Sequence, residues 1–217
     1  MQFLGKIGFF LKPHALIFDS WYSVMNTMAV EVELKTRIDD IEPLKERLFA
    51  IGHYNRSYQK VDTYWVSRQS FGPAVRVRRE KGVKADSMAY EFVLATVKTK
   101  TISDGIEVND EREFSVSDGV FFEELLQSLG MFKALSKEKN GWAWDIHQGA
   151  ALQPVDAELS LVTGLGWFLE LEIICPDGET QVIEESRKRL LALLAELEIP
   201  SSWIEERPYT VMLQGLA

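Results

Sequence analysis

The stretch AVEVELKTR, which runs from Ala29 to Arg37, decides the fold. Every second position carries a charge: Glu31, Glu33, Lys35 and Arg37. The positions between them are apolar or, at Thr36, weakly polar. Because successive side chains of a β-strand point to opposite faces, this strand has one charged face and one nearly apolar face. The fold depends on which of these two faces is inside the protein.

The same alternation recurs in five later segments, and each segment places like charges on one face. The same-face sets are Arg76/Arg78, Lys98/Lys100, Lys137/Lys139, Asp156/Glu158/Ser160 and Glu170/Glu172. Two like charges about 7 Å apart on a strand repel by about 0.6 kcal/mol in water and about 2.4 kcal/mol at an effective dielectric of 20. A sheet with one wet face also alternates, but surface strands more often mix the two signs. The sorted charges therefore favour an interior site, with acids for a divalent cation and bases for a polyanion.

Helical patterns are few, and they separate the strand-like segments. The sequence predicts helices over residues 39–52, 117–130 and 178–197, and a short C-terminal segment over residues 206–214. The remaining segments are rich in Val, Tyr and Trp and predict about eight strands. We therefore expect an α+β fold, in which a closed or nearly closed antiparallel β-barrel has a charged interior and helices packed outside.

Composition narrows the class of protein. The 217 residues are 46% hydrophobic, which is enough for a packed core, and the net charge of -9 argues against a general nucleic-acid binder. Cys175 is the one cysteine, so no intrachain disulfide can form, and we expect a cytoplasmic location. No run of 18 apolar residues predicts a membrane span. Residues 1–27 are apolar and aromatic; we interpret them as a non-catalytic extension rather than a signal peptide or a membrane-surface helix, and residues 28–217 as one domain.

Several motifs in chain order resemble the CYTH superfamily, the triphosphate tunnel metalloenzymes. They are EVELKTR at residues 31–37, VDTYW at 61–65, AVRVRRE at 74–80, LATVKTK at 94–100, KEK at 137–139, GLGWFLELE at 164–172 and ERPYTVMLQ at 206–214. The last segment is similar to the C-terminal end of the class IV adenylyl cyclase-like branch. The resemblance covers nearly the whole chain after the extension, and it implies the inward-facing charged barrel inferred above.

The resemblance also implies roles for individual residues. It assigns a metal site for Mg²⁺ or Mn²⁺ to Glu31, Glu33, Glu158, Glu170 and Glu172. It assigns triphosphate contacts to Lys35, Arg76, Arg78, Lys98, Lys137, Lys139 and Arg207, with Glu31, Glu33 and Lys35 as the catalytic group. Internal salt bridges between these bases and the acids are the alternative. The partner is a small triphosphate such as ATP, tripolyphosphate or thiamine triphosphate, and a homodimer is compatible with the resemblance.

Three functions remain open at this stage. The first is a class IV adenylyl cyclase, which converts ATP to cyclic AMP and pyrophosphate. The second is a triphosphatase, and the third is a non-catalytic triphosphate-binding module. The third draws support from Ser160, which stands where the family usually carries an Asp, so that Glu158 has to replace that carboxylate.

Some charged or polar residues are expected to lie outside the site. Glu111 and Glu113 share a face of their strand; we expect them at the surface, with an added acidic patch in the tunnel as the alternative. We also expect Arg37 at the surface, and Tyr209 in packing rather than in catalysis. Trp65, Trp142, Trp144 and Trp167 are predicted to pack helices against the outer wall of the barrel.

Overall fold

The computed structural model describes residues 30–67, 74–103, 106–149, 153–176 and 179–216. Within these ranges the side chains of residues 98–103 and 110–111 are not described. The predicted extension over residues 1–27 lies outside the described residues.

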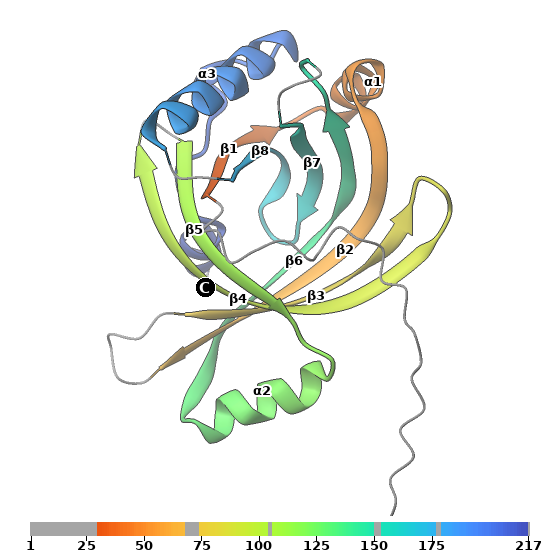
Figure 1. The fold of residues 1–217 in the computed structure, drawn as a ribbon. Coiled ribbons are helices and arrows are strands. Elements are labelled where there is room, and N and C mark those ends of the chain that lie inside the picture. Colours follow the sequence, from red (N-terminus) through yellow and green to blue (C-terminus); the bar gives the residue numbers. More distant parts are fainter. Residues whose placement is uncertain (1–29, 68–73, 104–105, 150–152, 177–178, 217) are drawn as a thin grey trace, which may run out of the picture.

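The described residues form eight strands that close into an antiparallel barrel (Figure 1). The strands follow one another around the barrel in the order β1-β5-β4-β3-β2-β6-β7-β8. Their bounds are β1 Val30–Ile38, β2 His53–Ser67, β3 Val75–Lys84, β4 Ala89–Ser103, β5 Ile106–Ser115, β6 Met131–Ile146, β7 Val155–Val162 and β8 Gly166–Cys175. The closed barrel predicted from the alternating charges is confirmed.

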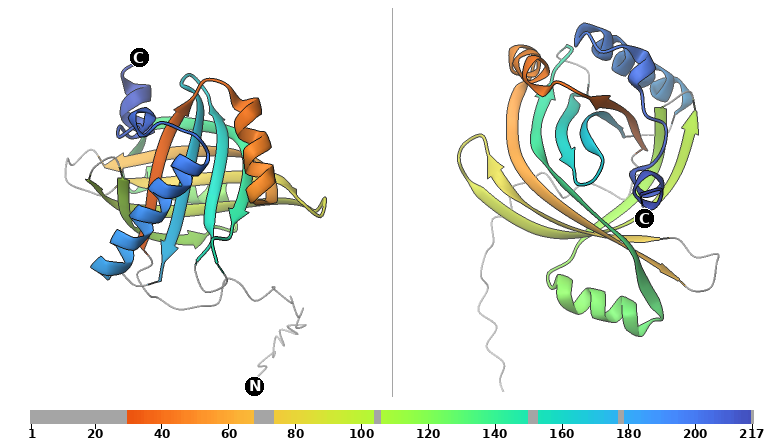
Figure 2. Two further views of the ribbon diagram at one scale, coloured as in Figure 1. Left: turned by 90° about the horizontal axis from the view of Figure 1, so that it is seen from above. Right: turned by 180° about the vertical axis from the view of Figure 1, so that it is seen from behind.

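The helices lie outside the barrel and begin where the sequence predicts. They are α1 Ile41–Ile51, α2 Gly119–Ser128, α3 Thr180–Glu196 and α4 Tyr209–Gln214, with a 3-10 turn η1 at Ser201–Trp203. Asp40 caps α1 by accepting from the backbone N–H of Glu42, and Asp118 caps α2 in the same way. In Figures 1 and 2, α1 and α3 cover one side of the barrel, and α2 lies on the opposite side. Within the described residues, no helix is long and apolar enough to cross a membrane.

The main hydrophobic core lies between the barrel wall and the helices rather than inside the barrel. Val32 and Leu34, from the apolar face of β1, are completely buried in it. They share this core with Leu48 of α1 and Leu190 and Leu194 of α3. The apolar face of β1 therefore points outward under the helices, and the charged face lines the interior.

The predicted packing of the tryptophans on the outer wall is confirmed. Trp144 is completely buried in the main core, and Trp142 and Trp167 stack on each other at its edge with ring centroids 5.7 Å apart. Trp65 packs with Val77 in a second cluster, beneath α2.

Gly141 allows β6 and β7 to approach each other closely. An ideal Cβ at this position would lie 2.3 Å from the carbonyl oxygen of Leu159 and 2.8 Å from the Cα of Ser160. Real Cβ atoms do not come so near to backbone atoms, so a larger residue would have to push the two strands apart.

We predict that Gly141→Ala lowers the free energy of unfolding by about 1–3 kcal/mol, because the added methyl group overpacks this contact. Gly215→Ala is the control, since a Cβ there would meet its nearest atom at 3.5 Å, and it should change stability by less than about 0.5 kcal/mol. Urea denaturation followed by circular dichroism measures both. Equal stability of the two variants would contradict the close approach.

Candidate functional site: a charged cavity inside the barrel

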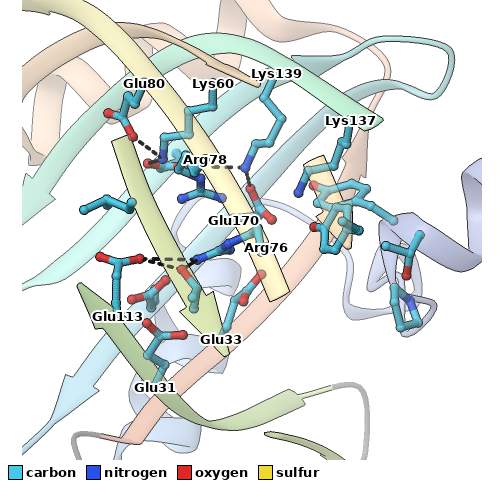
Figure 3. Close-up of a pocket in the computed structure, with 18 of the residues that line it drawn as sticks. Glu31, Glu33, Lys60, Arg76, Arg78, Glu80, Glu113, Lys137, Lys139 and Glu170 are labelled. Atoms are coloured by element: carbon cyan, nitrogen blue, oxygen red, sulfur yellow. Dashed lines mark hydrogen bonds and ion pairs between the residues drawn. The ribbon is translucent and has the colours of Figure 1, made fainter. Parts of the chain in front are cut away.

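The barrel encloses a cavity of about 1130 Å³ that opens to solvent. Ten of the twelve residues predicted from the sequence line it: Glu31, Glu33, Lys35, Arg76, Arg78, Lys137, Lys139, Glu158, Glu170 and Glu172. Figure 3 shows Lys60, Lys137 and Lys139 reaching in from one side, Glu31, Glu33 and Glu113 on the other, and Arg76 and Arg78 between them. The structure therefore brings together the acids and bases that the strand pattern sorted.

Two predicted site residues stand apart from this set. Lys98 lies on β4, but its side chain is outside the described part of the structure. Arg207 does not line the cavity; its exposed guanidinium forms a bidentate pair with Glu205, at 2.8 and 2.7 Å. The geometry therefore gives no support to Arg207 as a phosphate contact, because its neighbouring carboxylate already holds it at the surface.

Two residues expected at the surface belong to the site or its frame. Glu113 lines the cavity, where it lies 3.5 Å from Arg76 and accepts a hydrogen bond from Thr96 at 3.0 Å. Of its two expected positions it takes the one in the tunnel, because the register of β5 against β4 turns this face inward, although its side chain stays 31% exposed. The side chain of Glu111 is outside the described part. Arg37 is half-exposed but bound, with its Nε 3.1 Å from Glu205.

Carboxylates from three adjacent strands face one another across the inner wall. Glu33 of β1 is directly opposite Glu172 of β8 and Glu107 of β5 in the strand register. Carboxylate oxygens are the ligands that Mg²⁺ and Mn²⁺ prefer, and neighbouring negative charges inside a protein need a positive charge close by. The donor type therefore fits a hard divalent cation. In the described part of the chain, however, no three His, Cys, Asp or Glu side chains are already grouped around one point.

Lysines hold two of the predicted metal ligands. Lys139 pairs with Glu170 and lies 3.4 Å from Glu158, which also pairs with Lys60. Burial alone would raise the pKa of Glu170, but the charges of Lys139 and Lys137 and the hydrogen bond from Lys139 together outweigh it and lower that pKa to about 2. Burial also disfavours the ammonium form of Lys139, yet the two carboxylates raise its pKa overall. The salt-bridge alternative for Glu158 and Glu170 is thus realised in the structure.

Asp62 forms ion pairs with two of the cations that are predicted to bind phosphate. Its register partners are Arg78 on β3 and Lys137 on β6. The Nε and Nη2 of Arg78 donate to its carboxylate at 2.7 and 3.0 Å, and the Nζ of Lys137 lies at 3.0 Å. Burial would raise the pKa of Asp62, but these two cations hold it well below its usual range. Asp62 is completely buried, so it acts through its two partners.

A second charged cluster is formed by Arg56, Lys60, Glu80 and Asp156; of these the sequence analysis found only Asp156, on the face of Glu158, and gave it no role. Arg56 lies 2.8 Å from Glu158 and 3.5 Å from Glu80, and Lys60 lies 3.7 Å from Glu80. Burial and the charge of Glu158 raise the pKa of Asp156 to about 6. Lys60 and Asp62 alternate with apolar or neutral residues in the segment KVDTY, so the same parity argument could have found both.

One section of the cavity wall carries no charge. It contains Tyr64 of β2 and Leu135 of β6, and the uncharged side chains of Val66, Pro208 and Gln214 line the cavity as well. Tyr64 is the register partner of Leu135, and its ring lies 6.0 Å from the Nζ of Lys137. The neutral section is therefore next to the cationic part, and an uncharged group attached to an anion could lie there.

The chain is similar to known proteins in its three-dimensional structure. No protein-family model matches the chain, and no curated protein sequence matches it. The PH1819 protein from Pyrococcus horikoshii is 24% identical, with a TM-score of 0.73 over 86% of this chain and 99% of that one. An adenylate cyclase candidate from Vibrio parahaemolyticus is 18% identical, with a TM-score of 0.68 over 85% and 97%. HpAC1 from Hippeastrum, an adenylyl cyclase candidate with a dominant triphosphatase activity, is 15% identical, with a TM-score of 0.57 over 85% and 95%.

The chain has a CYTH-type fold. At these identities the likeness shows the fold, and the chemistry has to be argued from the cavity. The resemblance drawn from the sequence motifs is therefore confirmed for the fold. The CYTH-type barrel also explains why the charged faces of the strands converge, because each strand contributes its inward face to one closed wall.

We predict that Asp62→Asn lowers the free energy of unfolding at pH 7 by about 3 kcal/mol, because it leaves two buried cations without their carboxylate. Glu123→Gln is the matched control. Glu123 holds Arg79 in a similar bidentate pair, at 3.0 and 3.0 Å, but on the outer surface, and its loss should cost about 1 kcal/mol or less. Urea denaturation of both variants measures the difference, and similar losses would contradict a special role for Asp62.

The same pair predicts a pH dependence with a fixed sign. The pKa of Asp62 is lower in the folded state than in the unfolded state, so its stabilisation is complete above the unfolded value of 3.8. The stability gap between wild type and Asp62→Asn should be constant from about pH 8 to pH 5 and shrink below about pH 4. Denaturation at several pH values tests this, and a gap that widens toward low pH would contradict it.

Proposed function

We propose that the protein is an enzyme that binds and processes a triphosphate in the barrel cavity. The observation that carries this proposal is that five cations, Lys35, Arg76, Arg78, Lys137 and Lys139, line one cavity together with Glu31 and Glu33. In Figure 3, Lys137 and Lys139 reach in from the side opposite these two acids. Arginine and lysine donors bind phosphate oxygens, and a closed wall of such donors suits a polyanion with several phosphoryl groups. The fold that the chain shares with adenylate cyclase candidates supports the same class of substrate.

We propose Mg²⁺ or Mn²⁺ as the cofactor, held by Glu31, Glu33 and Glu172. Glu158 and Glu170, which lysines hold in the structure, contribute if those pairs open when substrate arrives. When bound, such an ion neutralises phosphate charge and increases the acidity of an attacking hydroxyl or water. The residues of the chain supply the rest: the bases align the phosphates, and the barrel wall limits access of water.

The reaction that we put first is that of a class IV adenylyl cyclase. The 3'-oxygen of the ribose attacks the α-phosphorus of ATP, and pyrophosphate leaves. The neutral section of the wall supports this choice, because a nucleoside could lie against Tyr64 and Leu135 while its phosphates reach Lys137. This section has no evident use for inorganic tripolyphosphate.

The second candidate is a triphosphatase, in which water attacks the terminal phosphorus in the same cradle. The dominant triphosphatase activity of HpAC1, which has a similar fold, supports keeping it. The third candidate is a triphosphate-binding module without turnover. Ser160 and the lysine pairs of Glu158 and Glu170 support this candidate, because both reduce the carboxylate available to a metal.

The deciding experiment incubates the protein with ATP, tripolyphosphate or thiamine triphosphate, each with Mg²⁺ and with Mn²⁺. Cyclic AMP with pyrophosphate supports the cyclase, and release of inorganic phosphate supports the triphosphatase. Binding without any product supports the binding module. If the protein binds none of the three compounds, the proposed function is wrong.

We predict that Glu31→Ala lowers metal-dependent turnover by at least about 100-fold, because removal of one group that stabilises transition-state charge typically costs about 10²–10³ in rate. Glu46→Ala is the control, since Glu46 is exposed on α1, outside the barrel, and does not line the cavity. Steady-state rates at saturating metal measure both. Full activity of Glu31→Ala would sink the assignment of the cavity.

A further inference from the structure

Tyr209 occupies an unusual place for a residue of the C-terminal helix. It is the first residue of α4, it is 7% exposed, and it lines the barrel cavity. Its ring packs edge-to-face on Phe168, with centroids 5.0 Å apart. The predicted packing role is therefore correct, but it accounts for only one side of the ring.

Three lysines surround the rest of the ring. The Nζ atoms of Lys35, Lys137 and Lys139 lie 5.0, 4.9 and 5.7 Å from the ring centroid. These distances are within the range of cation–π contact, which attracts each ammonium group toward the ring. Tyr209 thus stands among three of the cations proposed to bind the triphosphate.

The Tyr209 hydroxyl is buried beside the carboxylate of Glu170, which already pairs with Lys139, and within the described residues it makes no hydrogen bond of ordinary geometry. A buried donor without a good partner is costly, and most such groups in native proteins are satisfied by protein or by a bound molecule. A tyrosine hydroxyl carries its proton at neutral pH, so this group is available as a donor.

Other contacts fix α4 in place without using this hydroxyl. The backbone N–H of Glu205 donates to the carbonyl oxygen of Lys35 at 2.8 Å, and the side chain of Glu205 accepts from Arg37 at 3.1 Å. The Nη2 of Arg37 also reaches the Sδ of Met212 at 3.2 Å. These contacts tie the C-terminal segment to the end of β1, so packing alone does not require the hydroxyl.

We infer that Tyr209 is a substrate-positioning residue whose hydroxyl donates a hydrogen bond to a phosphoryl oxygen in the cavity. The ring would keep the three lysines apart and facing the same phosphates. The inference rests on the proposed triphosphate site and adds a neutral donor to its cations. It also couples binding to α4, because the ligand would contact a residue of that helix.

The test compares Tyr209→Phe with Tyr58→Phe. Tyr58 is also buried, but its hydroxyl donates to Glu158 at 3.0 Å. Tripolyphosphate in EDTA is the probe, so that metal-dependent turnover does not interfere, and calorimetry measures its affinity. Thermal unfolding without ligand measures the stability of each variant.

We expect Tyr209→Phe to bind tripolyphosphate about tenfold more weakly or worse, because a hydrogen bond to a charged group is lost. Its melting temperature without ligand should stay within about 2 °C of wild type, since no internal hydrogen bond is removed. Tyr58→Phe should instead melt several degrees lower, because the bond to Glu158 is broken. Tripolyphosphate should also slow amide exchange in residues 209–214 of wild type, and do so less in Tyr209→Phe.

Two results would overturn the inference while leaving the proposed function standing. One is an affinity of Tyr209→Phe within twofold of wild type. The other is a loss of melting temperature as large as that of Tyr58→Phe, which would make the hydroxyl a structural group. If wild-type protein itself does not bind tripolyphosphate in EDTA, the inference fails, whereas the proposed function is tested separately by the incubation of ATP, tripolyphosphate and thiamine triphosphate with metal.

Discussion

The charged groups inside the barrel can be buried only because each is matched across a strand boundary. Arg78 and Lys137 come from strands on either side of β2, and Asp62 between them accepts from both. Taking such groups out of water costs several kcal/mol per ion unless geometry and hydrogen bonding compensate. The rest of the wall follows the same rule, since Lys60 and Lys139 share Glu158 and Lys139 also pairs with Glu170.

This constraint reverses the usual arrangement of a small domain. Most inward positions of the strands carry charged side chains, so their apolar faces point outward and need cover. Helices α1 and α3 provide that cover on one side of the barrel, and α2 provides it on the other (Figures 1 and 2). The hydrophobic effect therefore holds the helices against the wall, while paired charges decide how the interior is filled.

The alternating charges predicted the barrel and most of the site because strand geometry is strictly periodic. Once Glu31 and Glu33 are placed inward, parity places Lys35, and the other strands follow in the same way. The same count extends to Arg56, which has the parity of Lys60 and Asp62 on β2. It fails only beyond Arg56, because a β-bulge between Tyr54 and Arg56 shifts the register there.

Other residues required knowledge of their neighbours in space. The side on which Glu113 lies depends on which strand pairs with β5, and sequence does not state that pairing. Tyr209 and Arg207 lie two residues apart, and only the fold separates the one in the cavity from the one held by Glu205. The alternation of side chains along a strand predicts which face a residue lies on. It does not predict which charged side chain pairs with that residue, or which helix packs next to it.

The separation of the two faces has a consequence for how such a protein can change. Substitutions on inward positions leave the outer core untouched, because the next residue along the strand belongs to the other face. Yet the inward residues form ion pairs with one another, so replacing one of them leaves the opposite charge unpaired in a low-dielectric interior. A shift of substrate preference in this scaffold would therefore proceed through compensated exchanges, such as one of Lys60 together with Glu158, rather than through independent single steps.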